Sequence, residues 1–300
     1  MGWAMTLEQL RIFAEVAQRL NMTRAAQALG ITQSAVSGAV AALETAHDIK
    51  LFHRVGRHIE LSDAGAMFLA EAQGVLARAE SARAALADWQ GLRRGRLALV
   101  ASQTIAGYWL PERLARFRAA YPQIALDVAI ANTDTAARAV LAGTAELGFV
   151  EGALDEPALA QWAVGADRMA LVGPAPVDHV SNAWLVQASW IMREAGSGTR
   201  STFEAALRAR GVDPAGLRPA LVLPSNEAVL SAVRAGAGHA VLSGLVVAEA
   251  VAAGHLHALP FDMPERPFFA LRHKERYRSR AAEALLAVMA AYEAAGDWVI

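Results

Sequence analysis

The sequence predicts a multidomain chain: an all-α winged helix-turn-helix module, a long linker helix, and a two-lobed α/β domain. Three observations lead to this prediction. Two short helical patterns meet at a glycine turn near residue 30, and a helical pattern runs without a strong break over residues 63–89. From residue 96 onward, strand and helix patterns alternate. We place the module at residues 1–62, the linker helix at 63–92 and the larger domain at 93–300.

Length and composition agree with this division. A chain of 300 residues suits one small module and one larger domain, and 55% hydrophobic with 19% charged residues is typical of folded protein. The lack of cysteine excludes disulfides, thiolate catalysis and cysteine-based metal sites. The sequence shows no secretory signal and no membrane span. We therefore expect a soluble cytoplasmic protein with no membrane partner, no metal and no cofactor.

The charge distribution favours nucleic acid at the N-terminal end only weakly. Residues 1–62 carry six Arg or Lys against five Asp or Glu, a net charge of +1, in a chain whose total is −1.

The first helix is predicted from a capping box. The Thr6 hydroxyl accepts from a free backbone N–H while Gln9 reaches back to the cap, and apolar residues then recur at helical spacing from Leu10 to Leu20. Thr23 can cap a second, short helix that runs to about Leu29.

The third helix is predicted over residues 33–46, with Val36, Val40 and Leu43 on its inner face. Gly30 suits a left-handed helix end, and Thr32 suits the cap of a new helix. A short helix, a glycine turn and a second helix form a helix-turn-helix unit, which inserts the start of its second helix into the DNA major groove. Gln33 can make paired hydrogen bonds to adenine, and Ser34 and Ser37 can donate to base edges or phosphates. In the alternative interpretation, Thr32 and Ser34 only cap and solvate the helix.

A hairpin wing is predicted next, because residues 51–61 contain two short β-prone runs around Gly56. Arg54 and Arg57 on such a wing are natural phosphate or minor-groove contacts. A solvated hairpin is the alternative.

The N-terminal segments resemble the LysR-type regulators. The resemblance covers about sixty residues at consistent spacing and rests on the runs Leu7–Phe13, Asn21–Leu29, Thr32–Ser37, Leu43–Glu44, Leu51–Arg54 and Leu61–Gly65. It implies DNA binding by Thr23, Arg24, Gln33, Ser34, Ser37, Arg54 and Arg57.

Two positions depart from this family. Ser34 stands where proline is usual, and Gly38 stands where arginine or lysine is usual. Glycine inside a helix costs about 1 kcal/mol, and the missing charge puts DNA affinity or operator preference in doubt.

The linker helix carries a seam for another helix. Apolar residues follow a 4-3-4-3 spacing at 68, 72, 75, 79, 82, 86 and 89. The resemblance implies that such helices pair between subunits, giving a dimer or a dimer of dimers. In the alternative, the helix packs on its own larger domain. Residues 91–96 are predicted to form a hinge.

In the larger domain, strands are predicted at residues 97–101, 124–131, 146–150, 168–172, 220–223 and 239–242. Their alternation with helices predicts largely parallel sheets with ligand chemistry at strand C-termini. The chain is predicted to cross twice between the two halves of this domain, because the last helix (279–295) returns to the first half. This arrangement resembles the clamshell of periplasmic binding proteins. We place lobe I at about 96–165 and 268–300, and lobe II at about 166–267.

An effector is expected between the lobes. The segments 102–104 and 196–200 both offer hydroxyls and backbone N–H groups at the start of a helix, which suits an anion or carboxylate. The alternatives are that Arg200 pairs with Glu204 and that Ser225 is only an N-cap. The predicted effector-binding residues are Ser102, Gln103, Thr104, Glu151, Thr199, Arg200 and Asn226.

Rival functions find less support. The sequence has no phosphate loop, no Gly-x-Ser-x-Gly elbow and no His-Glu-x-x-His pair, so an enzyme is not expected and no catalytic residue is assigned. A free-standing solute-binding protein would need an export signal and no helix-turn-helix. The sequence therefore predicts a regulator that binds double-stranded promoter DNA under the control of a small-molecule effector.

Overall fold

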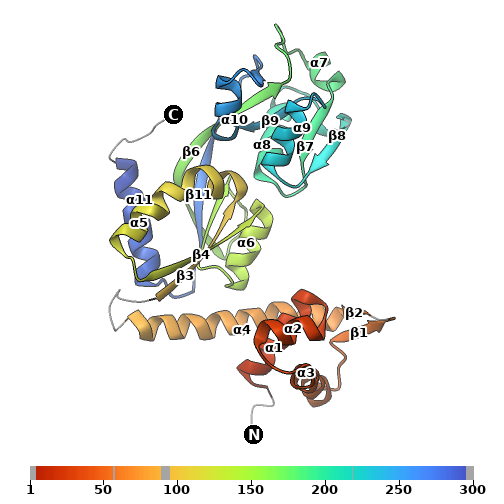
Figure 1. Cartoon of the computed structure of the whole chain (residues 1–300), viewed down its shortest axis with the longest axis vertical. Helices are drawn as coiled ribbons and strands as arrows, with labels where there is room; N and C mark the ends of the chain where they lie inside the picture. Colours follow the sequence, from red (N-terminus) through yellow and green to blue (C-terminus); the bar gives the residue numbers. More distant parts are fainter. Residues whose placement is uncertain (1–4, 57, 89–94, 218, 295–300) are drawn as a thin grey trace. The chain divides into compact units, whose positions relative to one another are not determined.

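The computed structural model describes residues 5–56, 58–88, 95–217 and 219–294, which group into two compact units (Figure 1). One unit contains residues 1–87 with 142–144, and the other contains residues 88–141 with 145–300. The predicted division of the larger domain falls inside two long strands of the second unit, β6 (Leu159–Gly173) and β11 (Glu265–His273).

Three helices build the core of the first unit: α1 (Leu7–Arg19), α2 (Met22–Leu29) and α3 (Gln33–His47). The predicted capping box of α1 is confirmed, because Thr6 accepts from the Gln9 N–H at 3.2 Å and its own N–H donates to Gln9 at 2.9 Å. Asn21, rather than the predicted Thr23, caps α2 by accepting from the Arg24 N–H at 2.9 Å. Since Asn21 precedes the first helical residue, it has the extended backbone that a cap needs.

Small and large apolar side chains alternate where these helices cross. Ala25 and Ala26 are fully buried on α2, which allows close approach, and Phe13, Val36 and Leu43 fill the space between the helices. The inner face predicted for α3 is therefore confirmed.

A short hairpin follows, formed by β1 (Phe52–Val55) and β2 (His58–Leu61). Glu44, near the end of α3, holds the start of the hairpin, because one of its carboxylate oxygens accepts from the Leu51 and Phe52 N–H groups at 2.9 and 3.3 Å. Burial alone would raise the pKa of Glu44, but these bonds and the ammonium of Lys50 hold it below its ordinary value. The wing is thus tied to the predicted recognition helix.

The long helix α4 (Asp63–Asp88) uses the first two positions of its apolar seam within its own unit. Phe68 and Ala72 pack against the helix-turn-helix core, whereas Val75 and Leu86 are 44% and 73% exposed. The seam position at residue 89 lies outside the described residues. Only the later part of the predicted seam is therefore open to another helix.

The second unit is built on a mixed sheet with the order β10-β6-β11-β5-β3-β4, and β9 also pairs with β6. A separate parallel pair joins β7 and β8. The strands not yet given are β3 (Gly95–Ser102), β4 (Ile124–Ala131), β5 (Leu147–Glu151), β7 (Trp190–Arg193), β8 (Pro219–Leu223), β9 (Ala240–Ser243) and β10 (His257–Ala258).

Helices cover both faces of the first part of this sheet. Leu97 and Leu99 on β3 face α5 and α11, while the next residue, Val100, faces α6, which lies on the other side (Figure 1). The remaining elements are η1 (Ile105–Trp109), α5 (Leu110–Ala120), α6 (Thr133–Ala142), α7 (Asn182–Gln187), α8 (Gly198–Ala209), η2 (Pro214–Gly216), α9 (Asn226–Arg234), α10 (Gly244–Ala252) and α11 (Arg280–Ala294).

The expectation of largely parallel sheets is only partly right. β3 pairs in parallel with β4 and β5, but β11 is antiparallel to both β5 and β6. The reason is that β6 and β11 are the two connections between the lobes, so one strand leaves the first lobe and the other returns beside it.

Candidate functional site

The first candidate site is the exposed face at the start of α3. Thr32 caps the helix by accepting from the Ala35 N–H at 3.2 Å, and its hydroxyl also lies 3.0 Å from that of Ser34. Gln33 donates to the Ser37 hydroxyl at 2.7 Å. The capping role considered for Thr32 is therefore present, while Gln33 and Ser34 remain exposed.

Two exposed arginines belong to the same unit. Arg24 lies on α2 and Arg54 on β1, and neither guanidinium has an ion-pair partner among the described residues. Thr23 is exposed beside Arg24. The predicted contact Arg57 lies outside the described residues. Unpaired arginines on one small unit suit phosphate contacts.

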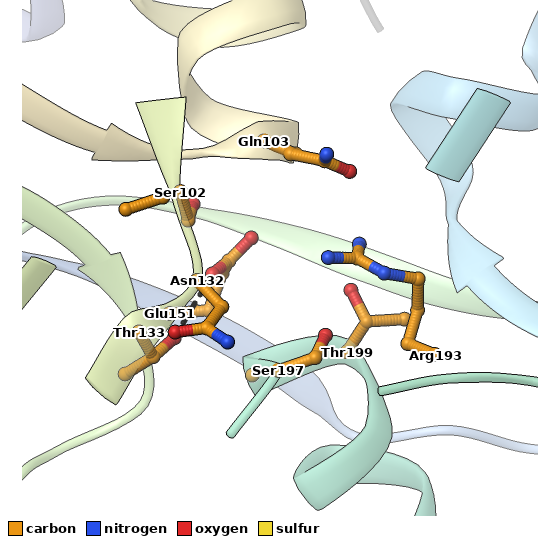
Figure 2. Close-up of a pocket in the computed structure, with 10 residues that line it drawn as sticks. Ser102, Gln103, Asn132, Thr133, Glu151, Arg193, Ser197 and Thr199 are labelled. Atoms are coloured by element: carbon orange, nitrogen blue, oxygen red, sulfur yellow. Dashed lines mark hydrogen bonds between the residues drawn. The ribbon is translucent and has the colours of Figure 1, made fainter. Parts of the chain in front are cut away.

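The second candidate site is a cleft in the second unit (Figure 2). About 160 Å³ of space at this cleft is not filled by protein atoms, and this volume includes space open to solvent. Its lining residues are Ser102, Gln103, Ala131, Asn132, Thr133, Glu151, Arg193, Ser197, Gly198 and Thr199.

The fold brings these residues together at strand ends and helix starts. Ser102 and Glu151 are the last residues of the parallel strands β3 and β5, and Thr133 follows the end of β4. Arg193 ends β7, and Thr199 lies in the first turn of α8. The carboxyl ends of parallel strands meet at one sheet edge, which explains this convergence.

Four of the seven predicted effector residues line the cleft: Ser102, Gln103, Glu151 and Thr199. The other three do not. Arg200 donates to Glu204 at 2.7 Å, which is the alternative considered for it. Thr104 and Asn226 are buried and bonded to each other at 3.0 Å.

Asn226 instead takes part in hydrogen bonds that connect the two lobes. Its backbone N–H donates to Gln103 at 2.8 Å, and the Gln103 amide donates to the Pro224 carbonyl at 3.2 Å. The Asn226 side chain also accepts from Arg193. A cleft residue from one lobe is therefore held by the start of α9 in the other.

Sequence reasoning missed Asn132, Thr133 and Arg193, and it included Ser197 only as part of the segment 196–200. Asn132 and Thr133 follow a predicted strand, so the rule that ligands bind at strand C-termini could have found them. Arg193 ends β7, which the sequence analysis did not predict, and only the three-dimensional structure places it in the cleft.

A buried charge network lies behind the cleft. Arg266 donates to both carboxylate oxygens of Asp167, its cross-strand neighbour, at 2.8 and 2.5 Å. Its Nη1 lies 3.8 Å from a Glu151 oxygen. Burial would lower the pKa of Arg266, but these two carboxylates raise it overall, so the guanidinium stays charged.

A second ion pair lies at the other wall. Arg193 donates to the two oxygens of the next residue, Glu194, at 2.8 and 3.0 Å. Burial would raise the pKa of the Glu194 carboxyl, but the bonds from Arg193 hold it below its ordinary value. The Glu194 carboxyl is thus ionised at neutral pH.

The described residues contain no group of three or more His, Cys, Asp or Glu side chains placed to hold a metal ion. Within the same residues, no helix is long and apolar enough to cross a bilayer.

Comparison with known proteins yields two family matches that together span most of the chain. Residues 7–66 match the bacterial regulatory helix-turn-helix protein of the lysR family, and residues 90–294 match the LysR substrate binding domain.

Similar whole proteins extend over nearly the full length. A probable RuBisCO transcriptional regulator of Nostoc sp. is 30% identical over 98% of this chain and 90% of its own. The uncharacterized HTH-type transcriptional regulator YeiE of Escherichia coli (strain K12) is 30% identical over 94% of this chain and 96% of its own.

Among solved structures, full-length CbnR complexed with its target DNA is similar, with a TM-score of 0.66 and 21% identity. The match covers 96% of this chain and 99% of that one. A full-length OxyR variant from Pseudomonas aeruginosa has a TM-score of 0.66 and 22% identity, covering 95% and 94% of the two chains. At these identities the likeness concerns the fold.

Proposed function

The chain belongs to the LysR family of bacterial transcriptional regulators, and from this premise we propose which of its residues meet DNA and effector. It is a DNA-binding regulator that carries a substrate-binding domain. The start of α3 enters the major groove of promoter DNA, with Gln33, Ser34 and Ser37 at base edges or phosphates. Gln33 and Ser34 are exposed and Ser37 is half-buried, which supports this assignment.

Phosphate contacts come from Thr23, Arg24, Thr32, Arg54 and Arg57. The assignment of phosphate contacts rests on one observation about Arg24 and Arg54. Among the described residues, neither guanidinium has an ion-pair partner, so no ion pair has to break before these arginines bind DNA. An arginine already paired with a carboxylate would have to exchange one partner for another.

Self-association is proposed through α4, as a dimer or a dimer of dimers. The exposed Val75 and Leu86 support it, because an apolar helix face left in water favours a partner helix. Paired subunits then span inverted half-sites about one helical turn, or a multiple of it, apart. We place the regulator in the cytoplasm, where its DNA is.

The effector binds in the cleft and carries an anionic group, with a carboxylate as the simplest choice. Arg193 and the N-terminus of α8 support this proposal, because both attract negative charge. Closure of the lobes around the effector changes the spacing or angle of the paired DNA-binding modules.

DNA binding is tested by capturing fragmented genomic DNA of the source organism on the purified full chain and sequencing what is retained. Arg54→Ala should weaken binding to the captured fragment and lower its salt dependence, because one phosphate contact is lost. Arg11→Ala is the matched control, since Arg11 is exposed on α1 but already paired with Glu8 at 2.8 Å.

A chain lacking residues 1–62 should lose DNA binding and keep ligand binding. Retention of the fragment by this truncated chain would contradict the assignment, and so would equal losses in the Arg54 and Arg11 variants.

A further inference from the structure

Glu151 presents a buried carboxylate to the cleft with few partners. Its side chain is 3% exposed, and its contacts are long: the Thr133 hydroxyl at 3.5 Å and Arg266 Nη1 at 3.8 Å. Arg266 directs its close hydrogen bonds to Asp167 instead. An ionised carboxylate can accept about four hydrogen bonds, so Glu151 retains acceptor capacity toward the cleft.

The charges around the cleft do not favour a ligand that is only an anion. Three carboxylates, those of Glu151, Asp167 and Glu194, surround two guanidiniums, those of Arg193 and Arg266. This group therefore has a net charge of −1, which the helix N-terminus offsets only in part. A purely anionic ligand would add a second negative charge close to the buried carboxylate of Glu151.

The opposite wall nevertheless suits a carboxylate. Arg193 uses three of its five N–H groups on Glu194 and Asn226, and Figure 2 shows its guanidinium pointing toward the side of the cleft that holds Glu151. Ser197 precedes α8 without a side-chain cap bond, so the first N–H groups of that helix keep their donor capacity.

An independent observation also points to a ligand. The hydroxyl of Ser102 lines the cleft, the residue is only 3% exposed, and its oxygen has no hydrogen-bond partner among the described residues. A buried hydroxyl without a partner loses the free energy of a hydrogen bond. A polar ligand atom in the cleft would supply the missing bond.

We propose that the cleft binds a small zwitterion, an amino acid being the simplest, with its ammonium group at Glu151 and its carboxylate at Arg193 and the start of α8. A neutral zwitterion matches both walls and adds no net charge to the buried network. This inference rests on the proposed function, because it specifies the effector of the same cleft.

The test is calorimetric titration of the full-length chain with three matched sets of compounds. The first set is the common L-amino acids, the second their deamino carboxylic acids, and the third the corresponding amines without the carboxylate. We expect one or more small amino acids to bind at least about tenfold more tightly than either matched compound, because each loses a charge-assisted hydrogen bond.

Two variants test whether Glu151 is the residue that distinguishes an amino acid from its deamino acid. Glu151→Gln should weaken the amino acid by about 10- to 100-fold and leave the deamino acid equal or better, because the variant keeps the shape of the side chain and removes its charge. Asp155→Asn is the matched control, since it removes an exposed carboxylate four residues further along that does not line the cleft, and it should bind as the original chain does.

The outcomes separate the two proposals. Carboxylic acids that bind as tightly as their amino acids would overturn the zwitterion and leave the anionic effector standing. Amines that bind without a carboxylate, or no binding from any set, would overturn both. Because the comparison among ligands uses the original chain, a Glu151 variant that fails to fold does not decide the result.

Discussion

Position 38 offers the sharpest test of how α3 meets DNA. Gly38 is the sixth residue of α3, exposed, and one turn beyond Ser34 on the same face. A Cβ added there meets no atom within 4 Å, so larger side chains fit without strain. Glycine in a helix interior costs about 0.5–1 kcal/mol relative to alanine, so Gly38→Ala should stabilise α3 by about that amount.

Gly38→Arg adds a charge to the same gain in helix stability, and comparison with Gly38→Ala isolates that charge. If the arginine reaches a phosphate, log K against log salt steepens by about 0.9 per subunit, or about 1.8 for a dimer on two half-sites. Gly38→Ala should leave the slope unchanged.

Fluorescence anisotropy measures this on a labelled captured fragment over a salt series of about 50–200 mM. Amide hydrogen exchange across α3 measures the helix stability separately. The reasoning is refuted if Gly38→Arg gives the slope and affinity of Gly38→Ala, because the exposed face of α3 would then lie away from the DNA backbone.

Three further outcomes are expected from the second unit. Gly198→Ala should reduce ligand affinity without removing a polar group, because its Cβ would lie 3.0 Å from a Glu151 oxygen; titration with unchanged affinity would contradict this. Asp167→Asn should lower the free energy of unfolding by about 3 kcal/mol, since it takes a close partner from the buried Arg266; denaturant unfolding checks the loss. Burial lowers the pKa of His239 from its ordinary 6.5, so the stability contributed by its neutral form is complete above pH 6.5 and is lost as the pH falls through the folded pKa. In His239→Gln, the free energy of unfolding should fall less steeply as the pH is lowered. An equally steep fall in the variant would contradict this role of His239.

The sequence by itself determined the parts of this protein that rest on local chemistry. The capping box at Thr6, the glycine turn at Gly30 and the inner face of α3 were all readable, because each depends on residues a few positions apart. The alternation of strands and helices likewise predicted the α/β domain, and the ends of its predicted strands pointed to Ser102 and Glu151.

Only the tertiary structure decided which side chains meet across long separations. Asn226 bonds to Thr104 from 122 residues away, which removes both from the lining of the cleft. Arg266 reaches Asp167 across 99 residues because β11 returns beside β6, and that close pair leaves Glu151 with its longer contacts. No local pattern specifies such pairings, because the register between distant strands depends on the packing of the whole domain. The charge balance of the cleft, and with it the kind of ligand we propose, follows from that register.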